Sequence, residues 1–460
     1  MHNEEIKFGA DIILCRCLRR AVSLNIESRE TNRLCRLLEA VYKCSDEMAM
    51  LSFAGHGAVL FPLLINVASH SSASLRSQMI AIRLLHRVKP SGISLSKVKD
   101  ADLLLIAIVR FLRTGMAGCQ KHALIALDGI VIHFESKPIA SRYPGLLEAV
   151  VISGDTCEAE TLAVLVNFAM DVRSKPAIVE TRGLLALLNR ACSSQAHAVR
   201  SLTCTVLQHL SSEISVRDRL VNFETNVLVL NLVSMLREKE STIRSKALQT
   251  LSNLVCETTA SAIGSIPNMF EQLAQVASSS PATNHSAIAA KAIKRLSLYI
   301  KTHHKCHQSF CDALVRMSRC PTLDVSLWTA RAYVEQSLKV SSSFILVRSE
   351  TNIDGLLALA RSKHTRVRAS AVEAIANLAQ EAANAKRLST HGAVFDILIT
   401  SIEAICDDDG SEDVRREAVR AILLMANHRT ASKRVAKYCG LIRSLSAYGT
   451  SIDGDVDLKR

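Results

Sequence analysis

The feature that most constrains this chain is an apolar pattern that recurs along most of its length. In VRASAVEAIANL, which begins at Val367, apolar side chains occupy offsets 0, 4, 7, 8 and 11. This spacing places them on one face of an α-helix. The pattern starts at nine residues, 38 to 47 positions apart: Leu75, Cys119, Cys157, Val199, Ile243, His285, Val325, Val367 and Val414. The copies at Cys119, His285 and Val325 are degenerate, so their register is allowed to slip by a few residues.

A second signal precedes several of these helices, and it consists of a glycine followed by a Leu-rich run. It occurs at Gly57, Gly145, Gly183, Gly355, Gly392 and Gly440. We therefore expect a second helix that opens at the glycine and a longer third helix behind it. One such unit cannot bury its apolar face alone, so neighbouring units must stack.

A period of about 42 residues with these two helices resembles the armadillo repeat. The two-helix HEAT repeat has an overlapping period and is the alternative, but the recurring glycine favours the armadillo type. The resemblance covers roughly residues 50–448 as about nine or ten units. It implies an all-α fold, a right-handed α-solenoid whose third helices line a concave groove.

Three regions follow from the pattern. We expect an N-terminal helical cap at 1–48, the repeat solenoid at 49–448 and a flexible C-terminal tail at 449–460. Aromatic residues make up only 4% of the chain. A core of Leu, Ala, Val and Ile suits closely packed helices.

The charge and the cysteines bear on partners and location. The formal charge of +13 favours an acidic protein segment, nucleic acid or an anionic membrane surface as partner. No C-x-x-C pair occurs, and Cys204, Cys256 and Cys439 stand where the helical pattern takes a small buried residue. With no apolar signal core and no transmembrane segment, the sequence predicts a cytoplasmic or nuclear protein in a reducing compartment.

Catalytic signatures are not evident. The sequence shows no phosphate loop, H-E-x-x-H or G-x-S-x-G motif, which predicts a non-enzymatic protein without a cofactor. The densest group of metal-type ligands is His303, His304, Cys306, His307 and Cys311, with Cys320 further on. Its spacing fits no closed zinc site, so we interpret it as a polar turn and leave metal binding open.

Candidate binding residues are those at offsets 3, 6 and 10, which face away from the core. Offset 10 gives Asn167, His209, Asn253 and Asn377, while Trp328 and Arg331 lie at offsets 3 and 6 of one helix. Asn amides both donate and accept, so a row of them can hold a peptide backbone. Trp and Arg are common binding anchors. Trp328 could instead fill a gap in the core.

Importin-α-like armadillo proteins combine such an Asn with a Trp four residues earlier. Here those positions hold Ala163, Gln249 and Glu373, so only half of the motif is present. The sequence therefore predicts a protein–protein scaffold that binds a peptide or partner segment in the groove. The alternatives are an importin-α-like cargo adaptor and a nucleic-acid or anionic-membrane adaptor. The latter would use basic turns such as Arg361, Lys363, Arg366 and Arg368, although scarce aromatics speak against nucleic acid. The sequence gives no oligomeric state.

Overall fold

The protein is described by a computed structural model. It covers residues 74–88, 101–279, 284–299, 307–404, 410–438 and 440–451, with six further positions between 38 and 69. These residues form helices joined by short turns, with no strand among them. The predicted N-terminal cap and the Gly57 signal lie outside the described residues, apart from isolated positions. The chain divides into two compact units, residues 1–223 and 224–460.

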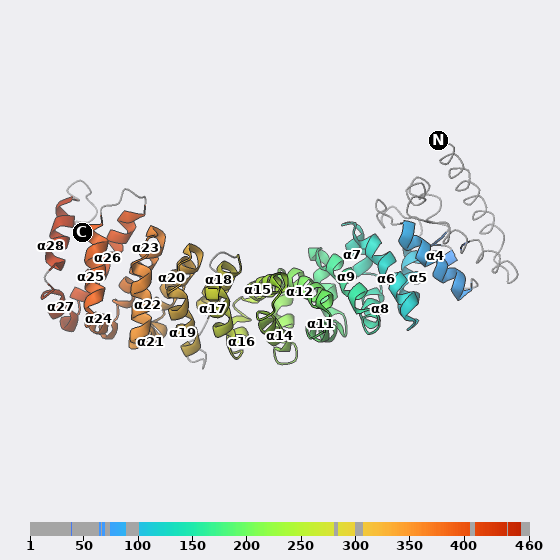
Figure 1. Ribbon diagram of the computed structural model, residues 1–460, viewed down its shortest axis with the longest axis horizontal. Coiled ribbons are helices and arrows are strands. Elements are labelled where there is room, and N and C mark those ends of the chain that lie inside the picture. Colours follow the sequence, from blue (N-terminus) through green and yellow to red (C-terminus); the bar gives the residue numbers. More distant parts are fainter. Residues whose placement is uncertain are drawn as a thin grey trace, which may run out of the picture. The chain divides into compact units, whose positions relative to one another are not determined.

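Unit 1 contains repeats of three helices (Figure 1). Its third helices are α4 (Leu75–Val88), α6 (Ala117–Val131), α9 (Glu158–Ala169) and α12 (His197–Ser211). Its second helices are α5 (Ala101–Leu112), α8 (Leu146–Ser153) and α11 (Leu184–Cys192). Its first helices are α7 (Ser136–Ser141), α10 (Lys175–Glu180, preceded by the 3-10 turn η2, Val172–Ser174) and α13 (Ile214–Val221). Each third helix packs on the next, as α4 does on α6 and α9 on α12.

Unit 2 repeats the arrangement. Its third helices are α15 (Ser241–Leu254), α18 (Asn284–Tyr299), α20 (Leu323–Ser337), α23 (Thr365–Leu378) and α26 (Ser411–Ala426). Its second helices are α14 (Val227–Met235), α17 (Met269–Ser279), α19 (His307–Ser318), α22 (Glu350–Ala360), α25 (Gly392–Glu403) and α28 (Leu441–Ser451). Its first helices are α16 (Ala260–Gly264), α21 (Val340–Arg348), α24 (Ala382–Leu388) and α27 (Arg429–Val435). Helix α28 extends three residues into the predicted C-terminal tail.

The apolar register of the third helices is confirmed. From Cys119 onward, offsets 4, 7, 8 and 11 are buried in every copy, and the copies at Cys119 and Val325 need no slip. His285, at offset 0 of α18, is only half-buried. The α4 copy begins one residue earlier than predicted, because Leu75 is 47% exposed while Gln78, Ala81, Ile82 and Leu85 are buried.

The residue before a second helix is often left-handed. Gly145 and Gly183 directly precede α8 and α11, as expected for a helix that opens at the glycine, and have φ of 73° and 82°. Asn226 and Asn268, with φ of 69° and 60°, precede α14 and α17 in the same way. Glycine, and less readily asparagine, tolerates this conformation. The prediction is wrong at Gly355, which lies inside α22, where an added Cβ would approach Ser318 Oγ to 2.8 Å.

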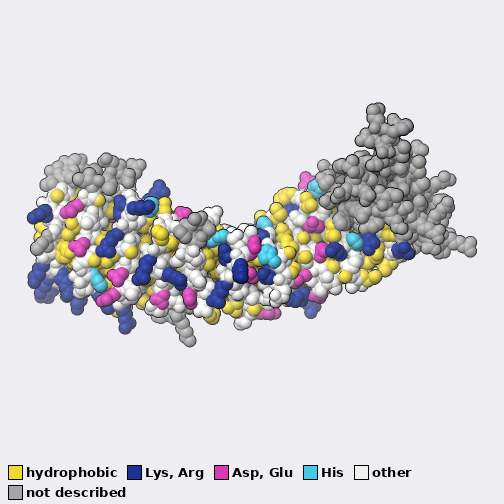
Figure 2. Space-filling model, viewed as in Figure 1, with side chains coloured by type: hydrophobic (Ala, Val, Ile, Leu, Met, Phe, Trp, Pro, Cys, Tyr) yellow, Lys and Arg dark blue, Asp and Glu magenta, His cyan; other side chains and the backbone are white. Residues whose placement is uncertain are grey.

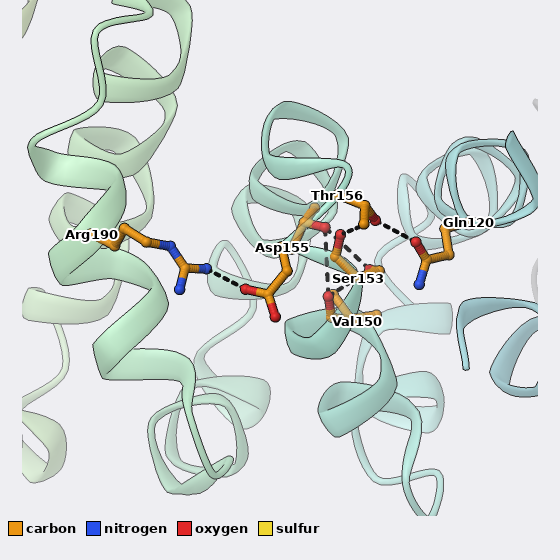
Figure 3. A network of polar contacts seen from close by, with 7 residues as sticks. Gln120, Val150, Ser153, Asp155, Thr156 and Arg190 are labelled. Atoms are coloured by element: carbon orange, nitrogen blue, oxygen red, sulfur yellow. Dashed lines mark hydrogen bonds and ion pairs between the residues drawn. The ribbon is translucent and has the colours of Figure 1, made fainter. Parts of the chain in front are cut away.

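Polar contacts tie consecutive repeats together. In Figure 3 the turn between α8 and α9 is held from both sides. Thr156 donates a short hydrogen bond to Gln120 Oε1 of α6, and Arg190 of α11 donates to Asp155 at 2.6 Å. Within the turn, Ser153 donates to the Val150 carbonyl at 2.7 Å. One turn thus contacts the repeats before and after it.

Candidate functional site

The candidate site is the outer surface of α18, α20, α23 and α26 in unit 2, called here the third-helix face. With the exception of Asn377, described below, residues at offsets 3, 6 and 10 of the third helices are exposed or half-exposed, as predicted for the copies from Cys157 to Val414. Because these helices pack directly on one another, the offsets form one continuous surface. The side chains on it decide what it can bind.

Trp328 lies on this face and not in the core. Its side chain is half-exposed, and two cations flank its indole ring. Lys291 Nζ of α18 is 5.8 Å from the ring centroid, and the Arg331 guanidinium carbon is 5.2 Å from it. Both distances are within the range of cation–π attraction. The three residues form an aromatic platform with a positive rim.

Carboxylates occupy the neighbouring part of the face. Glu335 of α20 pairs with Lys294 at 3.2 Å, and Glu417 of α26 pairs with Arg420 at 2.7 Å. Between them lies Glu373 of α23, which makes no hydrogen bond or ion pair within the described part of the chain. Partial burial raises the pKa of the Glu373 carboxyl, and the nearby Glu417 and Glu335 raise it further while Arg420 opposes them. Glu373 is therefore the carboxylate of this row that makes no ion pair among the described residues.

Asn377 was predicted to present an open amide, and this prediction is wrong. Its side chain is only 5% exposed. The amide nitrogen donates to Ser337 Oγ at 3.3 Å, and the amide oxygen accepts from Arg420 at 2.7 Å. The next helix, α26, covers the amide with Arg420. Asn377 therefore joins three consecutive third helices.

The other predicted residues are spread over both units. Asn253 of unit 2 accepts a hydrogen bond from Gln249 of its own helix at 3.0 Å. In unit 1, Asn167 donates to Asp128 at 2.7 Å, and His209 is half-buried. Burial raises the pKa of the Asp128 carboxyl, and the Asn167 hydrogen bond opposes that shift. Of the predicted set, the structure brings together Trp328 and Arg331 on α20, with Asn377 on the adjoining α23.

An arginine at offset 1 is the feature that sequence reasoning missed. Arg200, Arg244 and Arg368 each donate to two carbonyls five and six residues upstream, at 2.5 to 3.1 Å. Arg415 similarly donates to the Ala404 carbonyl, 11 residues upstream. Arg368, previously assigned to a basic turn, thus closes that turn. The sequence signal that could have predicted these arginine contacts is the Val-Arg or Ile-Arg pair that opens four of the nine copies.

The remaining basic residues do not form one track. Arg361 and Lys363 are exposed in the turn before α23, and Arg366 is exposed in the first turn of that helix. Around α27, Arg429, Lys433 and Lys437 are exposed. On the face drawn in Figure 2, Lys and Arg are interspersed with acidic and apolar side chains. Within the described residues, no helix is long and apolar enough to cross a bilayer.

The cysteine and histidine predictions have mixed outcomes. Cys204 is buried as expected, Cys256 is half-exposed in a turn, and Cys439 lies outside the described residues. Of the possible metal ligands, His303, His304 and Cys306 also lie outside them. Cys311 is fully buried, and burial raises the pKa of its thiol to about 12. Over the ranges that the structure describes, no three His, Cys, Asp or Glu residues are grouped to hold a metal ion.

Comparison with known proteins gives structural similarity only. No family model and no curated protein matches the chain. The crystal structure of an engineered protein is similar to 84% of this chain and 93% of its own length, with a TM-score of 0.57 and 21% identity. Together with the three-helix repeats, this decides the architecture.

The fold is an armadillo-type helical repeat. Two further solved structures are similar over 51% of this chain and 98% of their own length. One is a designed armadillo repeat protein in complex with a (KR)4 peptide, with a TM-score of 0.43 and 16% identity. The other is a computationally designed armadillo repeat protein for modular peptide recognition, with a TM-score of 0.44 and 15% identity.

Proposed function

We propose that the protein is a non-enzymatic scaffold that binds a segment of another protein on the third-helix face of unit 2. The observation that carries the proposal is the half-exposed Trp328 between Lys291 and Arg331. Exposed Trp–Arg pairs are typical binding anchors. The buried cysteines Cys311 and Cys320, which form no disulfide within the described residues, are in keeping with a reducing compartment, the cytoplasm or the nucleus.

The charges on this face define a complementary segment. Lys291 and Arg331 favour a partner carboxylate or an apolar side chain beside Trp328. Glu373, which makes no ion pair among the described residues, favours a partner Lys or Arg over α23. A segment with an acidic or apolar residue at one end and a basic residue at the other would match both parts.

The test uses a phage-displayed library of random 16-residue peptides selected on the full chain. Enriched peptides would then be measured by fluorescence anisotropy against the wild type and Trp328→Ala. We expect Trp328→Ala to weaken binding about thirty-fold, since a central Trp contributes about 2 kcal/mol or more.

A matched surface change provides the control. Lys433→Ala alters an exposed residue of α27 and should change affinity less than about two-fold. Peptides that bind Trp328→Ala as tightly as the wild type would place the binding surface elsewhere.

A further inference from the structure

A second surface, independent of the proposed function, lies on the second-helix side of unit 1. It consists of two open clefts. The first, of about 550 Å³, lies between α5 and the turn that precedes α8, and its apolar lining is Ile106, Val109 and Pro144. The second, of about 520 Å³, lies between α8 and α11, and its apolar lining includes Val151, Ile152 and Leu187. We call these the second-helix clefts.

The clefts expose large apolar side chains on a firm base. Ile106 is 46% exposed and Ile152 is 54% exposed. The base of the second cleft is closely packed, because a Cβ on Gly154 would come within 2.8 Å of Leu187 Cδ1. Each cleft thus offers one exposed isoleucine as an apolar contact point for a partner. Both clefts open widely to solvent, so a partner's side chain can reach their apolar lining.

Arginines border both clefts. Arg110 and Arg113 line the first, and Arg182 and Arg190 line the second, against the acidic Glu148 and Asp155. Arg190 is engaged by Asp155, as Figure 3 shows. Arg182 is exposed and makes no hydrogen bond or ion pair among the described residues. The first cleft therefore carries an excess of positive charge, with two arginines and no acid in its lining, while the second has two arginines against two carboxylates and leaves Arg182 available to a partner carboxylate.

We propose that the second-helix clefts bind an acidic amphipathic helix of a partner protein. The clefts are one repeat apart, and packed helices are about 8–10 Å apart. Two apolar residues seven positions apart on a helix are separated by about 10.5 Å, which matches that spacing. A helix also satisfies its own backbone hydrogen bonds. It therefore needs only apolar and charged side-chain contacts from this surface, which the clefts and their arginines supply.

The test selects the same random 16-residue peptide library on the full chain and counter-selects on the double variant Ile152→Ser, Arg182→Glu. Peptides that require the clefts should be acidic and carry two large apolar residues seven positions apart. We expect the double variant to weaken their binding at least ten-fold in fluorescence anisotropy. Trp328→Ala should leave it unchanged, which separates this surface from the third-helix face.

Matched controls test whether the effect is specific. Ile214→Ser changes an isoleucine of unit 1 that is 71% exposed, and Lys433→Glu repeats the charge reversal on α27. Both should bind the selected peptides as the wild type does. The proposal is overturned if every enriched peptide binds the double variant as tightly as the wild type. It is also overturned if the peptides that bind the double variant more weakly lack acidic residues, or if the control variants weaken binding equally. The proposal would also be overturned if the wild type bound phosphatidylserine vesicles but no peptide, and the double variant lost that vesicle binding.

Discussion

At the scale of single residues, the left-handed turns before second helices show how chain geometry selects residue types. Gly145 and Gly183 could be placed from the sequence because a glycine before a Leu-rich run is conspicuous. Asn226 and Asn268 adopt the same left-handed conformation before a second helix. They could not be placed from the sequence, because asparagine is common at many other positions. Gly355 misled for the opposite reason, since it serves the close approach of α22 to Ser318 and Tyr333.

Substitution at these turns should follow the backbone conformation. Gly183→Ala places a Cβ at φ 82° and 3.4 Å from Val151, so it should lower the free energy of unfolding by about 1 kcal/mol. Asn226→Gly relieves the same strain and should be neutral within about 0.5 kcal/mol. Urea denaturation of both variants measures the difference. Equal destabilisation would show that the left-handed conformation does not set the residue preference.

Asn377 should behave as a structural residue. Asn377→Ala removes the partner of Ser337 and leaves the Arg420 guanidinium without its amide acceptor. A buried hydrogen-bond network that loses a member costs about 1–3 kcal/mol. The half-exposed Asn253→Ala is the control and should cost less than about 0.5 kcal/mol. If hydrogen exchange in α20 and α23 is equally protected in both variants, the interpretation of Asn377 fails.

At the scale of elements, the third helices were predictable and their polar partners were not. Offsets 4, 7, 8 and 11 fix the buried face because helical geometry leaves no other arrangement. The pairing of Asn377 with Arg420 depends on how far α26 is displaced along α23, which no local pattern encodes. The helix boundaries around Ser349 were missed because α21 and α22 are separated by that single residue.

Helix α19 should make the stability of unit 2 sensitive to acid. His307 is buried, and neither ring nitrogen has a hydrogen-bond partner among the described residues. Burial lowers the pKa of His307, and the nearby Lys339 lowers it further. The folded state therefore favours the neutral ring, whereas the unfolded state takes up a proton below about pH 6.5.

The sign of this linkage gives a testable pH dependence. The stability contributed by neutral His307 is complete above about pH 6.5 and is lost as the pH falls towards the lower folded-state pKa, by up to about 1.4 kcal/mol per pH unit. Urea midpoints at pH 7.5 and 5.5 should differ more for the wild type than for His307→Leu. Identical shifts in the two proteins would assign the acid sensitivity to other groups.

At the scale of the molecule, the sequence predicted one continuous repeat array, and the structure has two compact units with the same layered order. Periodicity reports the local repeat and contains no information on where the chain divides into compact units. Binding surfaces are similarly difficult to predict from the sequence. Trp328 was found because it is unusual, but the second-helix clefts consist of common residues and emerge only when helices are packed.

The reach of the polar contacts has a mechanical consequence. Side-chain hydrogen bonds between neighbouring third helices join residues about one repeat apart: 43 positions for Arg295 to Ser252, 40 for Asn377 to Ser337 and 43 for Arg420 to Asn377. None of these hydrogen bonds spans two repeats. A unit stretched from its ends should therefore lengthen by releasing one repeat at a time and recoil in the reverse order. Each unit would act as an elastic element whose step length is set by the spacing of its third helices.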